Sequence, residues 1–170
     1  LRVRELVWRE PQYVDAVWKP LLAWGRSFGA ERLTWDDPAG DPVSALFPKS
    51  RREPFLMGRL TDIRSVLATL AYPADLSAEI TLSLQDPLAP WHEGTYSWSI
   101  QRGKGLLRTA PAGAVPDLSL GIGALTQLVF GEHPARRILA ADGAGNCREA
   151  ELELLERLFP PCGNFISEYF

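Results

Sequence analysis

Residues that build metal centres and disulfide scaffolds are scarce in this chain of 170 residues. It has two cysteines, Cys147 and Cys162, and two histidines, His92 and His133. Two cysteines on either side of an expected helix do not make a disulfide framework, and they favour a reducing, cytoplasmic setting. Neither histidine has a second ligand at a metal-binding spacing, so the sequence predicts no bound metal.

Charge and long apolar runs are also limited. The net charge of −3 at pH 7 gives no basic surface for nucleic acid. No apolar run reaches the roughly 18 to 20 residues that cross a bilayer, and no signal-peptide pattern is present. We therefore expect neither a nucleic acid nor a membrane as partner. The chain begins at Leu1, within a strand-like stretch, which indicates a piece of a longer protein.

Motifs for nucleophilic or nucleotide chemistry are missing as well. There is no G-x-S-x-G elbow, no P-loop and no dinucleotide-binding fingerprint. The stretch "RGKG" (102–105) lies between two strand patterns, where a turn requires glycine, and "DGAGN" (142–146) leads into a helix. We interpret both as structural. His92 and Glu93 are candidates for an acid–base pair, but adjacent side chains rarely converge on a substrate, which favours a structural role.

The spacing of the apolar residues predicts a mixed α and β protein (α+β) with helices packed on sheet faces. Trp18 and Trp98 fall at core positions of this pattern. The expected strands are 1–8, 31–35, 54–60, 78–85, 95–100, 103–109 and 116–122, and the expected helices are 12–28, 43–47, 63–70, 125–130, 134–141 and 147–159.

Local signals refine two of these helices. Pro20 is expected to kink or divide the first helix, because it lacks the N–H that an interior turn needs. Asn146 and Glu149 have the spacing of a box that caps the start of the last helix. Thr61 and Asp62 provide the cap of the helix that begins at residue 63.

The chain ends in "FPPCGNFISEYF", which places Phe165, Tyr169 and Phe170 within its last six positions. A terminus is usually mobile unless packing holds it. The aromatic side chains either pin the last segment to the sheet or bury the terminal carboxylate. Burial would raise the pKa of that carboxylate and make it a better general base. From the residues alone, pinning is favoured.

Four stretches resemble, in order, the C-terminal part of the Eis-like (enhanced intracellular survival) acetyltransferases. They are "VRELVWREPQYVDAVWKPL", "PFLMGRLTDIRSVL", "LSLQDPLAPWHEGTYSW" and "LERLFPPCGNFISEYF". The second is similar to the family's M-x-R-[IL]-x-D-[IV] junction and the third to its D-P-x-x-x-W-x-x-G hairpin. The fourth is similar to the family's aromatic ending, S-[DE]-Y-F. Together they span almost the whole chain.

The resemblance implies two domains. Residues 1–62 would be the end of a second GNAT-like domain, and residues 63–170 a sterol-carrier-protein-like domain, with the boundary between 54 and 73. In the family, an N-terminal GNAT domain carries the acetyl-CoA loop, [QR]-x-x-G-x-[GA], and a tyrosine general acid. No glycine pair of this chain is preceded by Gln or Arg at that spacing. We therefore expect no cofactor site here, and acetyl-CoA as a cosubstrate of the parent only.

By the same resemblance, the carboxylate of Phe170 is the general base of the parent enzyme, and Phe165 and Tyr169 anchor the tail. The parent would acetylate an amine, such as an aminoglycoside or a lysine side chain. This chain, inactive alone, would shape the acceptor pocket, contact the N-terminal GNAT domain and support a homo-oligomer in the cytoplasm. Two other functions stay open: a lipid or acyl-chain carrier with an apolar tunnel, and a bare oligomerisation module.

Overall fold

The computed structural model describes residues 1–3, 10–35, 57–131, 133–143 and 147–162. These residues fall into two compact units. The first includes residues 1–3 and 10–35, and the second includes the described residues from 57 to 162. Each unit is described by itself.

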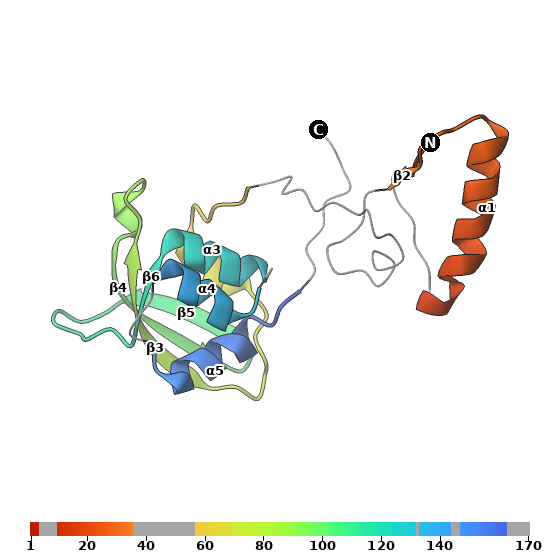
Figure 1. Ribbon diagram of the computed structural model, residues 1–170. Helices are drawn as coiled ribbons and strands as arrows, with labels where there is room; N and C mark the ends of the chain where they lie inside the picture. The colour runs from red at the N-terminus through yellow and green to blue at the C-terminus, as the bar shows by residue number, and fades with distance from the viewer. Residues whose placement is uncertain (4–9, 36–56, 132, 144–146, 163–170) are drawn as a thin grey trace. The chain divides into compact units, whose positions relative to one another are not determined.

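The first unit contains a parallel strand pair and one helix. Strand β1 (Arg2–Val3) pairs in parallel with β2 (Thr34–Trp35). A single 3-10 turn, η1 (Pro11–Tyr13), leads into α1 (Val14–Ser27) (Figure 1). The connection of two parallel strands through a helix is the usual one, because parallel neighbours cannot be joined by a tight turn.

Helix α1 runs through Pro20 and ends at Ser27, so of the two expected effects of this proline, a kink or a division, the division is wrong. Pro20 is exposed, and water can therefore solvate the carbonyl that loses its N–H partner. The helix buries Val14 and Trp18, which confirms Trp18 as a core residue.

The second unit is built on a four-stranded mixed sheet. Its strands are β3 (Ala78–Gln85), β4 (Gly94–Gln101), β5 (Lys104–Thr109) and β6 (Leu118–Gly121). Their order is β5-β4-β3-β6. The pairs β3/β4 and β4/β5 are antiparallel, whereas β3 and β6 are parallel. The alternation of apolar and polar residues predicts β3 to the residue, and β4 to within one residue at each end.

Helices cover one face of this sheet. They are α2 (Ile63–Thr69), α3 (Ile122–Phe130), α4 (Ala135–Asp142) and α5 (Glu149–Leu158), and a 3-10 turn, η3 (Pro90–His92), lies in the loop between β3 and β4. Figure 1 shows α3, α4 and α5 on the same side of the strands. The apolar alternate positions of β3 and β4 are buried, and the intervening serines and threonines are not. The predicted mixed α and β architecture is confirmed.

The core of the second unit is centred on Trp98 of β4. Its ring is fully buried, stacks on Phe159 at a centroid distance of 5.8 Å and meets Tyr72 edge-on at 5.9 Å. Ile100, Leu67 and other buried aliphatic side chains complete the layer. Aromatic pairs of this kind contribute about 0.5–1.5 kcal/mol each beyond their buried area. The prediction of Trp98 as a core residue is confirmed.

The stretch 102–105 is a turn, as expected. Arg102 and Gly103 both have positive φ, 49° and 77°, and they join β4 to β5 as the central residues of a tight hairpin turn. Gly105 then permits a close approach of the end of α2. A β-carbon at this position would lie 2.4 Å from the carbonyl oxygen of Leu67 and 2.7 Å from the ring of Tyr72.

Two expectations from the sequence are wrong. Residues 57–60 do not form a strand. Their backbone is directed instead toward α3, where the Leu60 N–H donates to Thr126 Oγ1. The last helix begins at Glu149 with Arg148 in the N-cap position. Asn146 lies outside the described residues, as do the expected helix 43–47 and most of the strand 1–8.

The expected cap of α2 is confirmed. Asp62 occupies the N-cap position and its carboxylate accepts a hydrogen bond from the backbone N–H of Ser65 at 3.0 Å. The Ser65 hydroxyl donates to the second carboxylate oxygen of Asp62 at 2.6 Å. Both hydrogen bonds from Ser65 hold the pKa of Asp62 below its ordinary value.

We predict that Gly105→Ala destabilises the second unit by about 1–3 kcal/mol, because the added methyl group collides with the backbone of α2. Urea unfolding of the whole chain measures the change. Gly123→Ala is the matched control, since nothing lies within 4 Å of a β-carbon there and the residue is in α3. The control should be neutral or slightly stabilising. Equal effects of the two substitutions would contradict the packing argument.

Candidate functional site

Three titratable side chains from separate elements meet inside the second unit. Arg59 precedes α2, Asp86 follows β3 and His92 ends η3. The Arg59 guanidinium donates to Asp86 Oδ1 at 2.5 Å, and His92 Nδ1 lies 2.9 Å from Asp86 Oδ2. The other ring nitrogen of His92 lies 3.0 Å from the carbonyl oxygen of Thr61. We call Arg59, Asp86 and His92, with the Thr61 carbonyl, the clasp.

The loop between β3 and β4 is folded around this clasp. Backbone hydrogen bonds from Ala89 to Asp86 and from His92 to Ala89 form two successive turns. The Asp86 N–H donates to the Glu93 carboxylate at 3.2 Å, and the Tyr96 hydroxyl donates to the His92 carbonyl at 2.8 Å. The loop between β3 and β4 is therefore held in one conformation by its own hydrogen bonds.

The Asp86 carboxylate is fully buried. Burial alone would raise its pKa, but hydrogen bonds from His92 and Arg59, together with their positive charges, hold this pKa below its ordinary value. Asp86 therefore stays ionised at neutral pH, with one partner on each carboxylate oxygen.

The clasp is arranged for structure rather than for acid–base work on a substrate. Both ring nitrogens of His92 face protein acceptors, so neither is directed at a bound molecule. The neighbouring Glu93 binds the Asp86 backbone. The structural role that the sequence favoured for His92 and Glu93 therefore fits the observed contacts.

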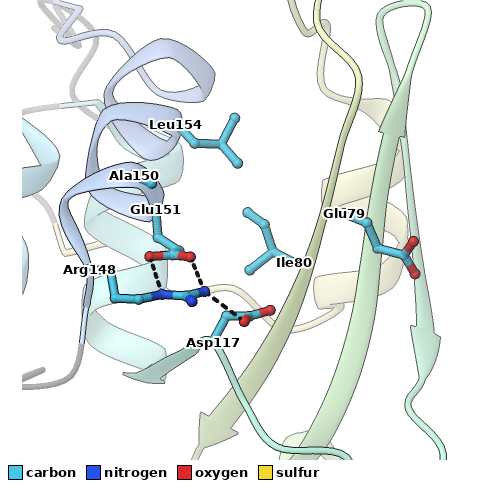
Figure 2. Close-up of a pocket in the computed structure, with 7 residues that line it drawn as sticks. All are labelled: Glu79, Ile80, Asp117, Arg148, Ala150, Glu151 and Leu154. Carbon is cyan, nitrogen blue, oxygen red and sulfur yellow. Dashed lines mark hydrogen bonds and ion pairs between the residues drawn. The ribbon is translucent and has the colours of Figure 1, made fainter.

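A small pocket lies between β3 and the start of α5 (Figure 2). Its volume is about 180 Å³, below the range of roughly 300–1,000 Å³ that is typical of ligand pockets. Arg148 crosses it and donates to Asp117 at 3.0 Å and to Glu151. The charged groups of the pocket therefore largely bind one another. The lining residues are Glu79, Ile80, Asp117, Arg148, Ala150, Glu151 and Leu154.

The surroundings of two further side chains, Cys147 and Tyr72, keep their reactive groups protonated. Burial, and then the negative charges of Glu151 and Glu149, raise the pKa of the Cys147 thiol. Burial also raises the pKa of Tyr72, whose hydroxyl donates to the Leu67 carbonyl at 2.8 Å. Neither is a good nucleophile at neutral pH.

Within the described ranges, no group of three or more His, Cys, Asp or Glu side chains is placed to hold a metal ion. Over the same ranges, no helix is both long enough and apolar enough to cross a membrane. The predicted site residues Phe165, Tyr169 and Phe170 lie outside the described residues.

Reading the sequence alone did not find the clasp. Arg59 and Asp86 are 27 positions apart and belong to different motifs, "PFLMGRLTDIRSVL" and "LSLQDPLAPWHEGTYSW". The available signal was that Arg59 follows the apolar stretch "PFLM" and Asp86 follows the alternating strand 78–85, positions at which burial would demand a partner of opposite charge. Which charges pair is decided only by the fold.

The second unit corresponds to a known domain family. The family of sterol carrier protein domains matches residues 63–166, which is more than half of the chain. The chain therefore belongs to the sterol carrier protein domain family. No curated protein sequence gives a significant match.

Solved structures extend the likeness to both units. A GCN5-related N-acetyltransferase from Kribbella flavida is 23% identical with a TM-score of 0.68. A probable N-acyltransferase of unknown function from Enterococcus faecalis is 20% identical with a TM-score of 0.76. Eis1 from Mycobacterium abscessus is 21% identical with a TM-score of 0.65. Each match covers 99% of this chain and 43% of the other.

At these identities the likeness concerns the fold. It confirms the resemblance to the sterol-carrier-like C-terminal part of Eis-like acetyltransferases. This chain spans less than half the length of those proteins, so their activities do not pass to it directly.

We predict that acid unfolding depends on Asp86. A lowered pKa means that the carboxylate contributes stability above its unfolded value near 3.9, and that this contribution is lost as the pH falls through the folded value. Urea midpoints measured from pH 7 to pH 2.5 should fall steeply below about pH 4 in the natural chain. Asp86→Asn should lower the midpoint at pH 7 and flatten this acid limb.

Asp75→Asn is the control for this experiment. Asp75 is an exposed carboxylate that pairs with Arg157 on the surface, and such pairs contribute little to stability. Its profile should follow that of the natural chain. If Asp86→Asn also gave a parallel profile, the buried carboxylate would not be the group that titrates.

Proposed function

We propose that this chain is the non-catalytic C-terminal region of an acetyl-CoA-dependent N-acetyltransferase. One observation carries the proposal: a single alignment to N-acetyltransferase structures covers 99% of the chain, and thus both of its units. A free-standing carrier domain would account for residues 63–166 only. The first unit finds its counterpart in the same enzymes, which supports a parent of that class.

In this proposal, the region shapes the acceptor pocket and supplies the base. A primary amine is protonated at neutral pH and must lose a proton before its nitrogen attacks the thioester carbonyl. The C-terminal carboxylate of Phe170 would take that proton, and coenzyme A would leave as the thiol. Phe165 and Tyr169 would hold the tail in place, since positioning of this kind lowers a barrier substantially.

The proposal also includes an acceptor, a cosubstrate and a subunit arrangement. The acceptor is an amine such as an aminoglycoside or a lysine side chain, and acetyl-CoA binds to the N-terminal GNAT domain of the parent. The parent acts in the cytoplasm as a homo-oligomer. These features rest on the resemblance, and this chain alone is inactive.

A lipid or acyl-chain carrier is the second candidate, and the sterol carrier family match favours it. The pocket described above lends it no support, because a space of about 180 Å³ lined by Glu79, Asp117, Arg148 and Glu151 suits no acyl chain. A bare oligomerisation module is the third. Exposed apolar side chains such as Leu88 and Trp91 are compatible with it.

We predict that deletion of Phe170 from the parent enzyme lowers kcat about 100-fold or more, with the dissociation constant of acetyl-CoA nearly unchanged. The deletion moves the terminal carboxylate back by one residue, about 3.3–3.6 Å, and so misplaces the base. Steady-state kinetics and a direct acetyl-CoA titration provide the two measurements. Raising the pH should partly rescue the variant, because more of the amine is then deprotonated in solution.

Phe170→Leu is the matched control, since it keeps the terminal carboxylate at its position and changes only the ring. It should retain most of the activity. If deletion of Phe170 left kcat and its pH profile unchanged, the proposed base would be excluded.

We also predict that the purified 170-residue chain carries no copurified lipid. Native mass spectrometry tests this directly, because a sterol or an acyl lipid would add its mass to that of the chain. An adduct of that size would favour the carrier. Assembly that increases with concentration and needs no ligand would favour the oligomerisation module.

A further inference from the structure

We propose that the clasp holds His92 as a doubly protonated imidazolium, and that this cation locks the β3–β4 loop to the segment before α2 in a protonation-dependent way. The inference concerns the second unit only. It does not depend on the proposed acetyltransferase function.

The first step is the identity of the atoms around the ring. Nδ1 of His92 faces a carboxylate oxygen of Asp86 at 2.9 Å, and Nε2 faces the Thr61 carbonyl oxygen at 3.0 Å. Both partners accept hydrogen bonds and neither donates one. A neutral imidazole carries a single N–H, so it would leave one buried nitrogen lone pair against an oxygen lone pair. Only the imidazolium satisfies both contacts.

The second step excludes a proton on Asp86 instead. A protonated Asp86 could donate to a neutral His92, but its other oxygen accepts from the Arg59 guanidinium at 2.5 Å. A guanidinium favours an ionised carboxylate, because charge-assisted hydrogen bonds are the stronger ones. Asp86 thus stays an anion and the proton stays on the ring.

The third step is the balance of charge around the ring. Asp86 and Glu93 come from the loop itself, and Asp62, at the start of α2, interacts electrostatically with His92. Arg59 is the cation of this group. Among Asp86, Glu93, Asp62 and Arg59 the carboxylates outnumber the one cation, and a protonated His92 therefore lowers the net negative charge of this group.

The clasp determines how firmly the loop is held. At the tip of the loop, Leu88 and Trp91 are 81% and 75% exposed, and the Trp91 ring meets His92 edge-on at 5.8 Å. Loss of the imidazolium proton would break one of the two ring contacts and weaken the link to Thr61 or to Asp86. The loop should therefore loosen on the alkaline side and close as the pH falls.

The test uses nitrogen-15 NMR of the whole chain labelled at histidine. The chain has two histidines, so His133→Gln assigns the signals. We expect both ring nitrogens of His92 to be protonated at pH 7.5, where an unperturbed histidine is mostly neutral. The indole N–H signal of Trp91 should shift at the pH at which His92 finally titrates. His92 as a single neutral tautomer at pH 6 to 7.5 would overturn the proposal.

Two variants distinguish the clasp from ordinary packing, because they should act in opposite directions. Arg59→Gln removes the competing cation and should move the titration of His92 to higher pH by roughly one unit. Asp86→Asn removes the anion and should move it to lower pH by a similar amount. Arg59→Gln keeps a side-chain amide that can donate to Asp86, and circular dichroism of both variants shows whether they are folded before the histidine signals are compared. Shifts in the same direction, or no shift for Arg59→Gln, would contradict the proposal.

Discussion

The second unit depends on the compensation of one buried charge. Transfer of an ionised carboxylate from water to a protein interior is costly unless it is paired and hydrogen-bonded. Asp86 meets this condition with Arg59 on one oxygen and His92 on the other. Because these partners lie on different segments, the compensation also fixes the start of α2 against the end of β3. A local electrostatic requirement thus sets the placement of two elements.

The sheet and its helices form around this fixed point. Only one face of the sheet is apolar, so the helices gather on that face and meet in the layer around Trp98 and Phe159. Gly105 lets α2 approach β5 closely. A small pocket lined largely by charged side chains lies at the edge of this layered arrangement, between β3 and α5.

Sequence patterns predicted the elements whose structure depends mainly on residues close to one another in the chain. The alternation of β3 and β4, the Asp62 cap and the turn after Gln101 are signals of this kind. The strand expected up to Leu60 failed because a tertiary hydrogen bond to Thr126 decides that backbone. The sequence did not predict the clasp for the same reason, since the spacing of residues along the chain does not determine which buried charges will pair.

The clasp and the tail both bear on the proposed function, in which this region supplies a group to the active site of a parent enzyme. The backbone N–H of Cys162 donates to the Gly131 carbonyl at 2.7 Å, so the second unit fixes the chain at that residue. Eight residues follow Cys162 in the sequence, and a peptide of eight residues spans at most about 28 Å. A terminal carboxylate used as a base must act within that reach. In the proposed chemistry the second unit therefore has to hold Cys162 in place, and the contacts of Asp86 with Arg59 and His92 are among those that join its segments.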